Sequence, residues 1–158
     1  MMDFKHNRSK AVNQPARFGA AVVESAFVLP ILLFMLFAFL DLGLAAIRQN
    51  ALSDASRRIA RQAIIHGGLN PNNATQWGPD PFMGTAATDS PVVATVKAAF
   101  PTMNMEDVEV QVSWPDGGNL PGDHVLVTVG YRHEVLVPGM LFWGSLDLTS
   151  YTSMQIVN

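Results

Sequence analysis

An uncharged apolar run, residues 25–40, is the feature that most limits how this chain can fold. The wider stretch from 20 to 47 contains only two charged residues, Glu24 and Asp41. A bilayer core about 30 Å thick is crossed by about 20 apolar residues in a helix. The stretch therefore predicts one transmembrane helix at residues 20–47. Pro30 fits this prediction, because membrane helices tolerate an internal proline better than soluble helices do. A buried core helix is the alternative, but no other strong helical pattern in the chain could surround it.

The helical pattern continues beyond the apolar run. Residues 48–66 are predicted to form an amphipathic continuation, which Gly67 and Gly68, with Pro71 beyond them, are predicted to end. Apolar side chains recur there at steps of three and four, and the arginines fall between them. The apolar positions are Leu44, Ile47, Ala51, Leu52, Ala55, Ile59 and Ala63.

The rest of the chain is predicted to contain a loop and a small domain. Residues 67–90 are rich in Gly, Pro and Asn, as loops are. Residues 91–158 would open with a short helix, capped by Ser90 and started by Pro91, and continue with alternating antiparallel strands. The fold class is therefore α+β: a long N-terminal transmembrane and amphipathic helix, followed by a small antiparallel sheet with a short helix. The expected elements are a helix to Phe100 and strands at 108–114, 124–137 and 146–157.

Charge is distributed unevenly along the chain. Residues 1–65 carry eight Lys/Arg and four Asp/Glu, whereas residues 66–158 carry two Lys/Arg and nine Asp/Glu. The first part suits a position near anionic lipids and the second a position in water. The acidic part argues against nucleic-acid binding, which needs a basic surface. Residues 1–19 are predicted to be a basic cytoplasmic leader; four basic side chains flank the apolar stretch on each side, so their count does not decide the orientation.

Glu24 is the charged residue that most needs an explanation. A charge costs about 2.5–3.5 kcal/mol at the centre of a bilayer and less at its interface, where Glu24 is expected. A carboxylate near a helix N-terminus also gains about 0.3–1 kcal/mol from the helix dipole. Glu24 could therefore be a tolerated residue at a helix start. Asp41 is predicted to be a rim residue at the outer membrane interface.

The residues around Glu24 favour a second interpretation. Gly19-Ala20-Ala21-Val22-Val23-Glu24 follows a basic leader and precedes the apolar run, which resembles the processing signature of type IV prepilins. The longer stretch GAAVVESAFVLPILL, then DLG and ASRRIARQA, is similar to the TadE-like family of minor pseudopilins. The similarity is best over residues 17–65, looser over 108–157, and absent from 67–90.

The resemblance implies a pilin-like subunit that assembles and does no chemistry. A membrane-embedded prepilin peptidase would cut between Gly19 and Ala20, on the cytoplasmic side, and Glu24 would pair with the new amine of a neighbouring subunit. The other partners would be the membrane, pilin-like subunits and an inner-membrane assembly platform. The chain would be a single-pass protein of the bacterial inner membrane, with its C-terminal domain outside the cytoplasm. Ala20 and Ser25 differ from the residues usual in major pilins, which favours a minor, assembly-type pseudopilin of a Tad/Flp-type pilus or related secretion system.

No motif indicates an enzyme, a cofactor or a small-molecule substrate. The chain has no cysteine, no Gly-rich phosphate loop and no nucleophile elbow. Asp123-His124 and His133-Glu134 could suggest a metal or acid–base pair. An odd separation in an extended strand places His124 and His133 on opposite faces, and both are predicted to be solvent-exposed. The four histidines are His6, His66, His124 and His133.

Two alternatives remain open at this point. The chain could be an unprocessed, signal-anchored membrane protein with an extracytoplasmic binding domain. It could also be a secreted domain whose conventional signal peptide is cut near Gly43-Leu44-Ala45, where residues 43 and 45 are small. The second alternative is weakened by the length of the preceding segment and by Glu24 and Pro30 within it.

Overall fold

The computed structural model describes residues 18–71, 76–139 and 144–157. Residues 1–17, most of the predicted leader, therefore lie outside the described part of the chain. The chain forms two compact units, and the boundary between them falls between Leu36 and Phe37.

The N-terminal unit contains the first part of helix α1, Phe18–Ile65, which continues through Pro30. Its large apolar side chains are exposed, among them Val22, Phe27 and Leu32. Among the described residues, α1 is the one helix long and apolar enough to cross a membrane. A face of this kind is not stable in water, so it needs lipid or other apolar helices around it.

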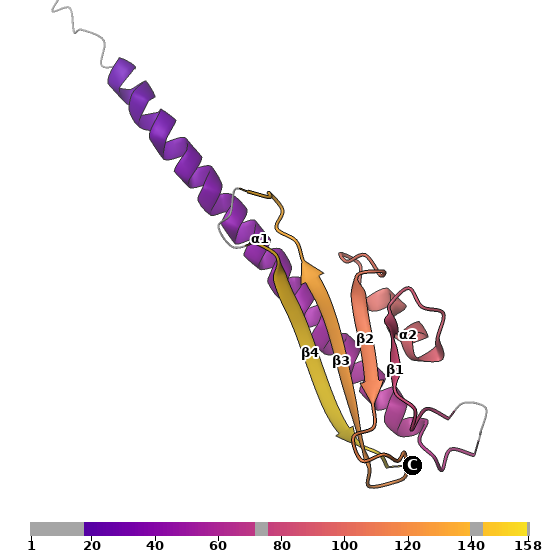
Figure 1. Ribbon diagram of the computed structural model, residues 1–158. Coiled ribbons are helices and arrows are strands. Elements are labelled where there is room, and N and C mark those ends of the chain that lie inside the picture. Colours follow the sequence, from indigo (N-terminus) through magenta and orange to yellow (C-terminus); the bar gives the residue numbers. More distant parts are fainter. Residues whose placement is uncertain (1–17, 72–75, 140–143, 158) are drawn as a thin grey trace, which may run out of the picture. The chain divides into compact units, whose positions relative to one another are not determined.

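The C-terminal unit, residues 37–158, is built on a four-stranded antiparallel sheet in the order β1-β2-β3-β4. Figure 1 shows the strands side by side, with the C-terminal part of α1 running along one face of the sheet. Central residues are in register across three strands, since Glu109 pairs with Gly130 and Gly130 pairs with Thr149. The strands are β1 Phe82–Thr85, β2 Val108–Ser113, β3 His124–His133 and β4 Leu146–Gln155.

The core lies between α1 and one face of this sheet. The helix contributes one or two side chains per turn, and β2 and β3 contribute every second side chain, as the two periodicities require. A buried valine gains about 1.5–3 kcal/mol relative to an exposed one, so six of them provide much of the driving force for docking the helix. The buried residues of α1, β2 and β3 in this core are Leu52, Ala55, Ile59, Ala60, Ala63, Val108, Val110, Val112, Val125, Val127 and Val129.

This architecture confirms the predicted α+β class. A short helix, α2 (Pro91–Ala94), starts as predicted, because the Ser90 hydroxyl accepts a hydrogen bond from Val92 N at 3.3 Å. The predicted extension to Phe100 is wrong. The helix stops after Ala94, and a 3-10 turn (η2, Lys97–Ala99) follows. The run of β-branched residues in this segment, which favours helix weakly, accounts for the early end.

Two strand predictions also differ from the structure. Strand β3 ends at His133 instead of residue 137. Strand β1 lies inside the 67–90 segment, which was predicted to be a loop. Four residues with a glycine among them are too few to show an alternating pattern, so β1 is defined by its pairing with β2 and not by its own sequence.

The end of α1 is held by close contacts with the segment that follows. His66 stacks on Trp77 at a ring-centroid distance of 5.0 Å. Gly78 has φ +84° and lies against the ring of Trp114, so a Cβ at this position would come within 2.4 Å of the indole. Glycine is required there for both reasons.

Candidate functional site

The prepilin-like residues lie at the beginning of α1. Gly19 and Ala20 are in its first turn, and Glu24 follows in the second turn. All three are exposed. The dipole of a helix acts within its first turn, so it stabilises Glu24 less than a carboxylate at the helix start. The structure therefore weakens the interpretation of Glu24 as an ordinary helix-start residue.

Glu24 has a polar side chain on an apolar surface. It makes no hydrogen bond or ion pair with any residue that the structure describes, and its neighbours Val23, Phe27 and Val28 are exposed. The next residue, Ser25, is satisfied within the helix because its hydroxyl donates to Ala21 O at 2.8 Å. Glu24 alone is thus left with a charge for which this unit offers no partner among its described residues.

Nothing in the described part of the chain requires glycine at position 19. A Cβ added there would meet no atom within 4 Å, and its φ is not in the left-handed region. Glycine costs about 1 kcal/mol relative to alanine inside a helix. Gly78 shows the opposite case, since the fold itself requires glycine there. A functional role is therefore the better explanation for glycine at position 19.

The C-terminal unit contains a buried polar cluster that the sequence did not indicate. Asp41 and His133 are both 0% exposed, and His133 Nε2 lies 3.4 Å from Asp41 Oδ1. The same oxygen accepts a hydrogen bond from Leu136 N at 2.9 Å. On the other side of the imidazole, Nδ1 accepts a hydrogen bond from an Arg48 guanidinium nitrogen. Asp41, His133 and Arg48 therefore form a polar cluster between α1 and the end of β3.

Arg48 also connects this cluster to one further segment, at Thr102, and to a second residue of β3, Tyr131. Its second terminal nitrogen donates to Thr102 O at 2.8 Å, and its guanidinium lies over the ring of Tyr131 at 5.1 Å. Buried charges are tolerated when they are paired and hydrogen-bonded. Arg48 and Asp41 each have such partners, whereas Arg48 Nε and His133 Nε2 are buried without a hydrogen bond among the described residues. The cluster fixes the angle and register of α1 on the sheet at this end.

The prediction that His133 is solvent-exposed is wrong, although the prediction for His124 is confirmed. His133 has the same parity along β3 as Val125, Val127 and Val129, so it belongs to the face that packs on the helix. Strand parity could have found it. Asp41 is likewise no exposed rim side chain, because the segment after β3 folds over it.

Further along the helix, polar contacts join α1 to the edge strand β4. Gln49 Nε2 donates to Thr149 O at 2.9 Å. The hydroxyl of Ser56 bonds to those of Ser150, at 3.2 Å, and Thr152, at 2.9 Å. These hydrogen bonds stabilise the docked helix, although Gln49 Oε1 is buried without a partner among the described residues.

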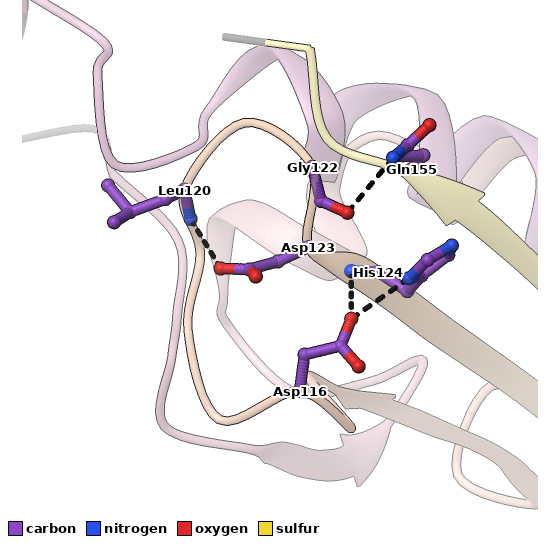
Figure 2. Close-up of polar contacts among 6 residues, drawn as sticks. All are labelled: Asp116, Leu120, Gly122, Asp123, His124 and Gln155. Atoms are coloured by element: carbon purple, nitrogen blue, oxygen red, sulfur yellow. Dashed lines mark hydrogen bonds and ion pairs between the residues drawn. The ribbon is translucent and has the colours of Figure 1, made fainter.

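His124 lies in a different environment, at the turn between β2 and β3 (Figure 2). Asp116 Oδ2 accepts hydrogen bonds from His124 N at 2.7 Å and from His124 Nδ1 at 2.9 Å. Asp123, which the sequence placed beside His124, instead accepts from Leu120 N at 3.0 Å. No group of three or more possible metal-ligating side chains occurs in the described residues. The hydrogen bonds between Asp116 and His124 therefore stabilise the turn between β2 and β3.

This turn should make stability depend on pH. The hydrogen bond from the His124 side chain, and then the one from its backbone, hold the pKa of Asp116 below its ordinary value of 3.8. A lowered pKa contributes stability above 3.8 that disappears as pH falls through the lower, folded-state value. We expect Asp116→Asn to be slightly less stable than the parent near neutral pH and to match it at strongly acidic pH. Chemical denaturation at both pH values measures this difference, and a gap that does not change with pH would contradict it.

These observations define a class: an α+β domain joined to an exposed apolar helix of membrane-spanning length. A model for the family described as TadE-like protein matches residues 19–61. The TadE-like resemblance found in the sequence is thereby confirmed over these residues. Searches of curated proteins and of solved structures found no match. The family is a structural family of pilus assembly, and the match and the apolar helix together fit a membrane protein associated with the Tad pilus.

Proposed function

We propose that this protein is a TadE-like minor pseudopilin that a prepilin peptidase processes after Gly19. The single observation that carries the proposal is the placement of Gly19 and Glu24, five residues apart, within the family match and in front of the apolar helix. The fold does not require glycine at position 19. A peptidase does have a use for it, because a residue without a side chain lets an active site approach the backbone closely.

Processing would also give Glu24 a partner. Cleavage leaves an amine on Ala20, whose reference pKa is near 7.7–8.0, so it is largely protonated at neutral pH. An exposed carboxylate on an apolar helix surface is costly in a bilayer, and so is an unpaired ammonium. Pairing the two between neighbouring subunits lowers the cost of both, provided that the helices pack together.

The buried cluster argues against the secreted-domain alternative. A conventional cut near Gly43-Leu44-Ala45 would separate Asp41 from residues 46–158. That cut would leave His133 and Leu136 N without the carboxylate that they contact. It would also cut inside a continuous helix at Ala45, which is buried in the C-terminal unit. Helix α1 is therefore better understood as a permanent part of the folded protein.

The proposed partners and location follow from this role. The leader would remain in the cytoplasm and the C-terminal unit would lie outside the inner membrane. Other pilin-like subunits would pack on the apolar part of α1, and an inner-membrane platform would receive the processed chain. The acidic C-terminal unit would select partners.

Two glycine variants test the processing step. In cells that contain the prepilin peptidase, the parent chain should lose its leader, and Gly19→Val should keep it. Gly43→Val is the matched control, because Gly43 is also an exposed glycine of α1 whose Cβ would meet no atom within 4 Å. This control should be processed like the parent. The proposal fails if the parent chain keeps its leader or if Gly19→Val is shortened normally, and intact mass distinguishes these results.

A further inference from the structure

We infer that the segment after β3, residues 135–139, is a second membrane contact that lies in the lipid interface beside α1. The inference rests on membrane anchoring by α1 and does not require cleavage at Gly19. It concerns only the C-terminal unit, which contains both this segment and the helix from Phe37 onwards.

The first observation is the direct link between this segment and the end of the apolar run. Leu136 N donates to the carboxylate of Asp41 at 2.9 Å, and Asp41 follows immediately after residues 25–40. A backbone contact with residue 41 places Leu136 at the level where the helix leaves the hydrocarbon core of a bilayer. The segment therefore lies where an interfacial element would have to be.

The second observation is a set of exposed apolar side chains in the same unit. Leu136 is 50% exposed, and Phe39, Leu40 and Leu42 of α1 are exposed in the same unit. No charged residue occurs in the sequence between Glu134 and Asp147. Insertion of an exposed leucine into the lipid layer that already surrounds the apolar helix lowers the free energy, because it removes further apolar area from water.

The third observation is the burial of the Asp41 carboxylate. A carboxylate at the membrane surface is costly where lipid covers it, but Asp41 is fully buried and is contacted by His133 and Leu136 N. The segment thus covers the one charge of α1 that would otherwise face the acyl chains here. It presents an apolar side chain to lipid and a backbone donor to the carboxylate.

Single labels can test this contact, because the chain has no cysteine of its own. Leu136→Cys would be labelled with a polarity-sensitive fluorophore in the full chain, reconstituted in vesicles of phosphatidylcholine and phosphatidylglycerol. The matched control is Leu120→Cys, since Leu120 is 55% exposed and lies in the turn that precedes the start of β3. Pro138→Cys, at a second exposed position of the segment, guards against a local effect of the Leu136 change.

Labels at 136 and 138 should show blue-shifted emission and lose most of it when the vesicles contain lipids with a quencher near the headgroups. The label at 120 should keep a water-like emission and escape quenching. Equal and weak quenching at all three positions would overturn the inference. The result is independent of leader processing, since the chain in these vesicles need not be cleaved.

Discussion

Replacing Asp41 with alanine is expected to lower the free energy of unfolding of the C-terminal unit by about 1–3 kcal/mol, the usual cost of leaving a buried polar group without its partner. The substitution leaves the buried imidazole of His133 beside Arg48 without the carboxylate and leaves Leu136 N without its acceptor. Unsatisfied groups in a low-dielectric interior account for most of this loss.

Denaturation of the detergent-solubilised full chain can measure this loss. Trp77 and Trp114 are 8% and 7% exposed, so their fluorescence reports whether the core is intact. Asp54→Ala is the control, because Asp54 is a carboxylate of the same helix in an exposed pair with Arg58. Such surface pairs contribute about 0–1 kcal/mol. The account of the cluster is wrong if Asp41→Ala is no more destabilising than Asp54→Ala.

Replacing Glu24 with alanine is expected to reduce assembly to background while membrane insertion stays normal. The apolar run that drives insertion is unchanged, and the removal of a charge favours the bilayer. Assembly suffers because the protonated amine of a neighbouring subunit would enter an apolar helix bundle without a partner. Glu24→Gln should fail in the same way, because it preserves shape but not charge.

The two parts of this prediction need separate measurements. Extraction with alkaline carbonate reports insertion, and recovery of the subunit in the sheared or crosslinked pilus fraction reports assembly. Ser25→Ala is the control, since the Ser25 hydroxyl bonds only to Ala21 O within its own helix, among the contacts of the described residues. Normal incorporation of Glu24→Ala would refute the pairing of this carboxylate with an amine.

Much of the architecture could be predicted from periodicity. Side chains repeat with the period of one local geometry in three places. These are the apolar run, the steps of three and four to residue 63, and the alternating valines of β2 and β3. Strand β1 could not be predicted in this way, because β1 is too short to show a period and depends on β2 for its pairing.

The polar cluster was missed for a different physical reason. The partners of His133 could not be inferred from the local sequence, because Asp41 and Arg48 lie 92 and 85 residues away. Strand parity could have placed His133 on the inner face, but its contacts with Asp41 and Arg48 depend on the tertiary fold. Gly19 is the opposite case, because its motif is visible in the sequence. The structure adds that packing among the described residues does not explain why this position is a glycine.

The most direct test of the central proposal is the N-terminus of the mature protein, determined by mass spectrometry of the chain purified from cells with their own prepilin peptidase. The proposal predicts that the chain begins at Ala20 and that this form disappears when the peptidase is deleted. A chain that still carries residues 1–19 would contradict it. The protein would then be an unprocessed signal-anchored membrane protein, and Glu24 would have no neighbouring amine to pair with.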